Sequence, residues 1–320
     1  MYIKFLIAKF KYVIIIITII LFDTVKDMEM DLKLFNQFKK WAIIALFSDD
    51  ELSERFVLKG GTALQFLNIS NRASMDIDVS MTDDFSPEEL SLIKERMENA
   101  FKETFSEYGF IIFDFKFFPR PMHQDEERNR YWGGYSVEFK IHKTEEFNKL
   151  STNLSALRRS AEIVGKNDSR KFSIDISKRE FCYNPQVKKL EGYSIYLYTP
   201  EMIICEKIRA LCQQLPQYFI NGGKAKKPRP RDFYDIYTIM RSCNMTFEQI
   251  NMHIFKEFFK IKMVDLSLLD LVITKDYCEY TKGDVKSLIN TLPIEEQTNF
   301  NFDKYFSFVA NGIKIIKNRL

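Results

Sequence analysis

Residues 56–80, FVLKGGTALQFLNISNRASMDIDVS, decide how this 320-residue chain folds. An apolar approach leads into the Gly60-Gly61 pair, and glycines allow a tight turn that brings the backbone close to a ligand. Residues 62–68 are suited to a short helix, whose first N–H groups would face anionic oxygens. Residues 75–81 alternate apolar and polar side chains with the period of two that a half-buried strand requires. The stretch therefore predicts a strand, a glycine turn, a helix and a second strand.

Two carboxylates, Asp76 and Asp78, lie on one face of that second strand, because the residue between them points to the other face. Their Cα atoms would be about 6.7 Å apart. Carboxylates that approach to about 4 Å repel each other by roughly 4 kcal/mol at an effective dielectric of 20, and a bound cation removes this penalty. Oxygen ligands without nearby His or Cys favour a hard ion, so we expect Mg²⁺ or Mn²⁺ together with a nucleoside triphosphate (NTP).

The blocks K-G-G-T-A-L (59–64) and R-A-S-M-D-I-D (72–78) resemble the first motif of the DNA polymerase β-like nucleotidyltransferases. The form is that of the AbiEii/AbiGii toxins of bacterial abortive-infection and type IV toxin–antitoxin systems. The resemblance implies an α+β fold, with a mixed sheet flanked by helices and followed by a helical domain. Many members of the superfamily have Gly-Ser where this chain has a Gly-Gly-Thr run, so the threonine would replace the serine hydroxyl.

The same resemblance assigns nucleotide-binding residues around the glycine turn. The expected phosphate-holding residues are Gly60, Gly61 and Thr62, and the expected nucleotide contacts nearby are Arg72 and Ser74. An ion pair between Arg72 and a neighbouring acid is an equally good interpretation of that arginine.

A third carboxylate is expected from F-S-I-D-I-S (172–177), which we expect to be the last catalytic strand. Asp175 lies on its polar face and would be a metal ligand or the base for the attacking hydroxyl, as the superfamily resemblance implies. Glu138, on the polar face of Y-S-V-E-F-K-I (135–141), is the alternative. The motif I-D-I-S-x-R-E (174–180) resembles the toxin sequences more closely and favours Asp175.

The resemblance is strongest between Thr199 and Tyr237. Thr199 is a good N-cap and is followed by proline and glutamate, so a helix is predicted from there to the region of Pro216. Lys207 flanks the apolar stripe of this helix, and in the resembling toxins the corresponding lysine contacts the nucleotide, with triphosphate oxygens as its target here. The alternative is a lysine that only extends along apolar surface toward water.

The segment R-D-F-Y-D (231–235) carries two further acids. The family resemblance gives its first aspartate, Asp232, an active-site role and extends that role to Asp235 only by proximity. Aspartate before an apolar run is also a favoured helix N-cap, so simple capping is the competing interpretation of this pair.

A basic loop, N-G-G-K-A-K-K-P-R-P-R (221–231), lies between these two helices and contains no acidic residue. Its charges would follow RNA phosphates or receive pyrophosphate, and a solvated surface loop is the alternative. The candidate RNA-binding residues are Lys224, Lys226, Lys227, Arg229 and Arg231.

Composition indicates an ordinary folded enzyme. The chain is 46% hydrophobic, has a net charge of +3 and a pI near 8.4, which permits RNA as a partner. Five cysteines without C-x-x-C spacing indicate neither a disulfide framework nor a zinc site and fit the cytoplasm.

Three segments are expected along the chain: an extension over 1–27, a catalytic domain over 28–198 and a helical domain over 199–320. The extension contains an apolar run too short to span a membrane comfortably, so we expect no stable membrane partner and interpret it as a misassigned start or a non-essential extension. A membrane anchor or a buried strand is the alternative. An amphipathic helix with Phe38 and Trp41 would open the catalytic domain.

Together these features predict a metal-dependent nucleotidyltransferase that transfers a nucleoside monophosphate from an NTP to a hydroxyl. Resemblance to the toxins implies the tRNA 3′ end as acceptor, growth arrest or phage defence as outcome, and an AbiEi-like antitoxin as partner. Two alternatives remain: nucleotide transfer to a protein hydroxyl, and a non-catalytic module that binds GTP or RNA.

Overall fold

The computed structural model describes residues 33–122, 131–165 and 168–320. The hydrophobic extension predicted over 1–27 lies outside the described residues. A helix over 33–48 opens the described chain, and Phe38 and Trp41 are buried on it, as its amphipathic pattern predicts. No helix in the described part of the chain is long and apolar enough to cross a membrane.

One mixed sheet of seven strands forms the base of the described structure, in the order β3-β4-β5-β2-β1-β7-β6. β2 is antiparallel to β1 and parallel to β5, which places the two predicted acidic strands side by side. The α+β class with a mixed sheet is therefore confirmed. The strands are β1 (Val57–Lys59), β2 (Ile77–Ser80), β3 (Phe110–Arg120), β4 (Gly134–Lys143), β5 (Phe172–Ser177), β6 (Gln186–Leu190) and β7 (Tyr193–Leu197).

Two strands that the sequence did not predict follow β5, the strand that carries Asp175. β6 and β7 follow it as an antiparallel pair, and β7 runs parallel to β1. Glu191 and Gly192 have φ angles of 48° and 93° and form the turn between them, in the left-handed region that glycine adopts readily. These two strands extend the sheet on the side of β1, away from β5.

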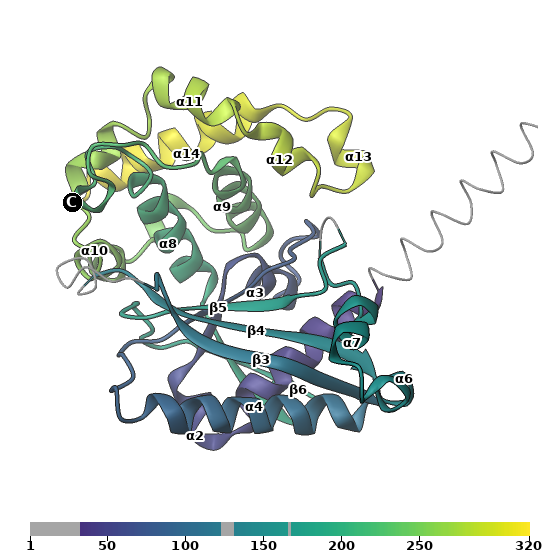
Figure 1. Cartoon of the computed structure of the whole chain (residues 1–320). Coiled ribbons are helices and arrows are strands. Elements are labelled where there is room, and N and C mark those ends of the chain that lie inside the picture. The colour runs from purple at the N-terminus through teal and green to yellow at the C-terminus, as the bar shows by residue number, and fades with distance from the viewer. Residues whose placement is uncertain (1–32, 123–130, 166–167) are drawn as a thin grey trace, which may run out of the picture.

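Helices before residue 198 pack around the sheet, and Figure 1 shows α4 lying across it on the side away from the later helices. α4 buries Phe101 and Phe105, which contact Phe139 of the sheet. These helices are α2 (Asp50–Arg55), α3 (Gly60–Phe66), α4 (Leu90–Glu107), α6 (Thr144–Leu150) and α7 (Leu154–Ser160).

From residue 200 onward the described structure is helical, as predicted, and lies above the sheet in Figure 1. The Thr199 side chain caps the first of these helices by accepting a hydrogen bond from the Met202 N–H. The helices are α8 (Pro200–Cys212), α9 (Pro230–Ser242), α10 (Met252–Lys260), α11 (Lys275–Lys282), α12 (Val285–Ile289), α13 (Ile294–Gln297) and α14 (Phe302–Lys317).

Candidate active site

The glycine turn connects β1 directly to α3, which begins at Gly60 rather than at Thr62 as expected. Gly60 has a φ of 69°, and a Cβ added there would lie 2.6 Å from Asp78 Oδ2. A Cβ on Gly61 would lie 2.7 Å from Ser74 Oγ and 2.9 Å from Arg72 Nη2. Both glycines are therefore required by the close approach of the turn to polar side chains of the site.

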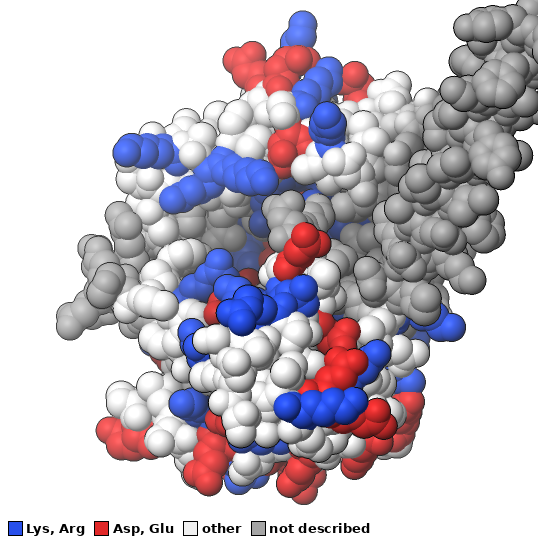
Figure 2. Space-filling view, turned by 45° about the vertical axis from the view of Figure 1, so that its right-hand side comes forward, with Lys and Arg blue, Asp and Glu red and all other residues white. Residues whose placement is uncertain are grey.

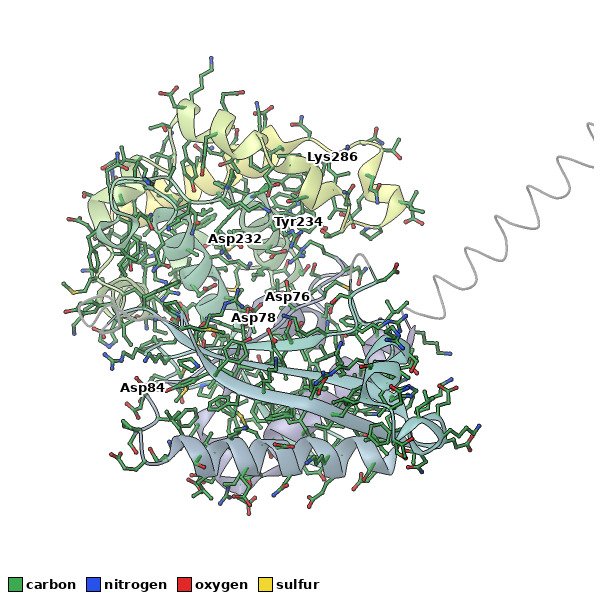
Figure 3. The ribbon with its side chains drawn as sticks, viewed as in Figure 1. Asp76, Asp78, Asp84, Asp232, Tyr234 and Lys286 are labelled. Carbon is green, nitrogen blue, oxygen red and sulfur yellow. The ribbon has the colours of Figure 1, made fainter. Side chains whose placement is uncertain are left out.

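The two aspartates of the first motif lie on the side of the sheet that faces the helical part (Figure 3). Asp76 immediately precedes β2 and is exposed, whereas Asp78 is half-buried within the strand. Burial raises the pKa of Asp78 to about 6, and the carboxylates of Asp76 and Asp175 contribute to this rise while Lys59 opposes it. The repulsion expected between the acids is thus present.

Asp175 is the register partner of Asp78 across the parallel β2–β5 pair, so the third acid lies beside the first two. Its carboxylate is occupied by protein donors: Arg120 Nη1 lies 2.9 Å and Ser136 Oγ 3.2 Å from Oδ1. Within the described ranges, no three His, Cys, Asp or Glu side chains are grouped closely enough to hold a metal. The three acids are neighbours without converging on one point, which corrects the expectation of a ready-made trio.

Glu138, the alternative third acid, does not lie in the cleft. It pairs with Lys171 at 2.7 Å and is opposite Ser173 in the β4–β5 register. Asp175 on β5, by contrast, lines the cleft.

A buried ion network, which we call the Lys207 network, connects α8, α9 and the loop before β2. Lys207 Nζ lies 2.8 Å from a carboxylate oxygen of both Asp232 and Asp235. Arg72 donates two hydrogen bonds of 3.0 Å to Asp235, and Arg229 pairs with Asp232. Each carboxylate therefore bridges two cations.

The geometry of this network excludes the helix-capping interpretation of Asp232. α9 begins at Pro230 without a side-chain N-cap, so Asp232 lies in the first turn and does not cap the helix. Burial alone would raise the pKa of Asp232, but Arg229 and Lys207 hold it well below its usual range. Burial alone would lower the pKa of Lys207, and the two aspartates raise it instead. These groups stay ionised, and Lys207 is buried and does not extend toward water.

Of two residues expected to contact the nucleotide near the glycine turn, only Thr62 differs from expectation. Thr62 is buried and donates its hydroxyl to the Asp76 carbonyl at 2.6 Å, so it braces the acidic segment and does not line the cleft. Ser74 does line the cleft, and its carbonyl accepts a hydrogen bond of 2.6 Å from the buried Lys39. The hydroxyl available near the glycines is therefore that of Ser74.

The basic loop borders the same cleft through Lys226, Lys227, Arg229 and Arg231, but not through Lys224. Lys227 is 80% exposed and lies 3.8 Å from Asp284, a weak surface pair. Arg231 donates to the Ser287 carbonyl at 3.2 Å. The loop thus supplies positive charge at the cleft, with Arg229 already committed to the Lys207 network.

A cleft of about 850 Å³ brings these groups together between the sheet and the helical part. Figure 2 shows a recess between the two parts, with Lys and Arg side chains on both of its walls. Figure 3 shows Asp232 on the helical side, across from Asp76 and Asp78. The arrangement combines acids, backbone N–H groups and a basic border, which suits a metal–nucleotide complex.

Sequence reasoning missed a second group of cleft residues: Lys59, Glu180, Arg209 and Lys262. Lys59 lies in the motif at 59–64 and Glu180 in the motif at 174–180, and this position in the motifs was the signal that could have identified them. Lys262 follows a helix with no motif around it, and only the fold brings it to the cleft.

Comparison with known proteins adds a family match. The family model of the nucleotidyl transferase AbiEii toxin, type IV toxin–antitoxin system, matches residues 42–304. A comparison with curated proteins returned no match.

Solved structures resemble the chain only distantly. A candidate nucleotidyltransferase from H. pylori is 17% identical, with a TM-score of 0.46 and coverage of 91% of this chain and 96% of that one. MenT4, the nucleotidyltransferase toxin Rv2826c from Mycobacterium tuberculosis H37Rv, is 12% identical, with a TM-score of 0.44 and coverage of 90% and 84%. With TM-scores below 0.5, these likenesses add no argument to the family match.

Proposed function

Since the chain belongs to the AbiEii family of nucleotidyltransferase toxins of type IV toxin–antitoxin systems, we propose that it transfers a nucleoside monophosphate from an NTP to the 3′ end of tRNA. Growth arrest, as in phage defence, would be the outcome, and an AbiEi-like antitoxin the partner. The single observation that carries the proposal is the adjacency of Asp76, Asp78 and Asp175 to the Gly60-Gly61 turn in one cleft.

A divalent metal fits the site of Asp76, Asp78 and Asp175 on physical grounds. Asp78 has a raised pKa because it is buried near two other carboxylates, and a cation at this point would relieve that repulsion. Asp76 and Asp78 would hold Mg²⁺ or Mn²⁺, and Asp175 would join them once it leaves Arg120. The metal would supply charge stabilisation at the phosphates.

The protein's own residues would position the nucleotide. The glycine turn offers backbone N–H groups at the start of α3, next to Ser74, for phosphate oxygens. Lys207 and Arg72 would act by holding Asp232 and Asp235 toward the nucleotide or acceptor, because both cations are already bound to these carboxylates. Asp175 would accept the proton of the attacking hydroxyl.

The acceptor would enter along the basic border of the cleft. Lys226 and Lys227 are exposed there and carry charge that follows RNA phosphates. This supports an RNA acceptor over a protein hydroxyl, because a protein substrate offers no regular row of anions.

The test is incubation of the protein with each labelled NTP, Mg²⁺ and either total tRNA or total cell protein. We expect label on tRNA and release of pyrophosphate, both reduced at least about 100-fold by Asp76→Asn. Asp83→Asn is the matched control, since Asp83 is an exposed aspartate outside the cleft. Label on protein alone would replace the acceptor, and transfer unaffected by Asp76→Asn would reject the proposed chemistry.

A further inference from the structure

A second buried cluster of charges lines the same cleft beside Asp78. This Glu180 cluster consists of Lys59, Glu180, Arg209 and Lys262, with side chains between 3% and 9% exposed. The Glu180 oxygens lie 3.4 Å from Lys59 Nζ, 2.8 Å from Arg209 Nη1 and 3.3 Å from Lys262 Nζ. One carboxylate thus lies among three cations that come from β1, α8 and the segment after α10.

Within the Glu180 cluster three cations face one carboxylate, and Asp78, the register partner of Lys59, is the acid beside it. Glu206 also approaches Arg209, but at 3.4 Å from Nη2. Burial is the main cause that lowers the pKa of Lys262 to about 8; Glu180 opposes this shift, and the nearby Arg209 and Lys59 add to it. Arg209 Nε is buried without a hydrogen-bond partner among the described residues. Because buried charges are normally paired, this excess indicates that an anion is received here.

The position of the cluster indicates which anion. Lys59 is the register partner of Asp78, and the next residue, Gly60, begins the turn that faces the acids. In the Lys207 network each carboxylate bridges two cations, whereas in the Glu180 cluster one carboxylate faces three cations and Arg209 Nε has no hydrogen-bond partner among the described residues. An anion bound beside Asp76 and Asp78 would therefore contact the Glu180 cluster.

We propose that the Glu180 cluster binds the two terminal phosphates of the NTP and holds them as the pyrophosphate leaves, an inference that rests on the proposed function. In the reaction the acceptor oxygen forms a bond to the α-phosphorus. The bond from that phosphorus to the bridging oxygen breaks, and its electron pair stays on the pyrophosphate. The hydroxyl proton goes to Asp175, and the cations of the cluster stabilise the charge that develops on the leaving group.

Binding of inorganic pyrophosphate to the full chain without metal, measured by isothermal titration calorimetry, tests the site. Lys262→Met removes one cation and is expected to weaken binding about tenfold or more. Glu180→Gln keeps the shape but removes the competing anion, so it is expected to tighten binding several-fold. Lys260→Met is the matched control: its side chain is 75% exposed, two residues away, and binding should not change.

The opposite signs separate a binding role from a structural one, because damaged folding weakens binding in both variants. Equal affinity of the wild-type chain and Lys262→Met, or equal weakening by Lys262→Met and Glu180→Gln, overturns the site. If either outcome is found while transfer to tRNA still depends on Asp76, the anion site is rejected and the proposed function is kept. If the expected binding pattern appears without any nucleotide transfer, the anion site is supported and the proposed function is rejected.

Discussion

Replacing Gly60 by alanine tests whether the glycine turn holds Asp78 in a working position. Gly60 has a φ of 69°, where a side chain costs about 1–2 kcal/mol. Its Cβ would lie 2.6 Å from Asp78 Oδ2, and ordinary contacts begin at 3.4 Å, so the carboxylate must move by about 0.8 Å. A displacement of about 1 Å among reacting groups lowers rates about 100-fold. We therefore expect Gly60→Ala to lower kcat about 100-fold and the free energy of unfolding by about 1–2 kcal/mol.

Gly109→Ala provides the matched control for this prediction. Gly109 has a φ of 80°, but a Cβ there would have no neighbour within 4 Å. The backbone cost should therefore be the same, and kcat should not change. Urea unfolding and the labelled-tRNA assay measure the two effects separately. Full activity of folded Gly60→Ala, or an equal loss of kcat in Gly109→Ala, would refute the reasoning.

Three further perturbations follow from the same site. Asp78 binds its proton more tightly in the folded chain, so its contribution to stability favours the fold at low pH and is lost as pH rises to about 6. Asp76→Asn should lower the pKa of Asp78 and raise the free energy of unfolding at pH 7 by up to about 1 kcal/mol, while abolishing transfer. A lower free energy of unfolding of the metal-free variant, measured with urea, would contradict this. Arg120→Gln frees Asp175 from an exposed pair worth about 0.2–1 kcal/mol, so the Mg²⁺ concentration for half-maximal activity should fall up to about fivefold; an unchanged requirement would show that the pair does not compete. Thr62→Val should lower the free energy of unfolding by about 1–3 kcal/mol without changing KM for NTP, whereas a raised KM at unchanged stability would return this hydroxyl to the phosphates.

The strand faces that carry Asp76, Asp78 and Asp175 were predictable from the sequence, because they depend on short-range periodicity. Alternation around Ile77 and Val79 places both aspartates on one face, and the structure confirms that these apolar neighbours are buried. The pattern on β5 has the same period, so it predicted which face Asp175 occupies. Register between strands then joined the two patterns.

Partners between distant segments were not predictable, because they depend on the tertiary fold. The pairing of Arg120 with Asp175 spans 55 residues, and no spacing rule in the sequence connects them. The resemblance to the family motifs predicted that Lys207 and Asp232 belong to one site, but not that Lys207 donates a hydrogen bond to Asp232. Lys262 reaches the cleft only through the packing of the helical part.

The bonds that cross from the sheet to the helical part have a consequence for any attempt to divide the molecule. Arg72 is bound to Asp235, the Ala73 N–H donates to the Thr291 carbonyl, and Lys262 donates to the Lys178 carbonyl. Ending the polypeptide after residue 198 would leave Arg72 without its counter-ion and would divide a hydrophobic core to which both parts contribute. A fragment of this kind should aggregate when produced by itself, and co-expression of the two pieces should rescue it.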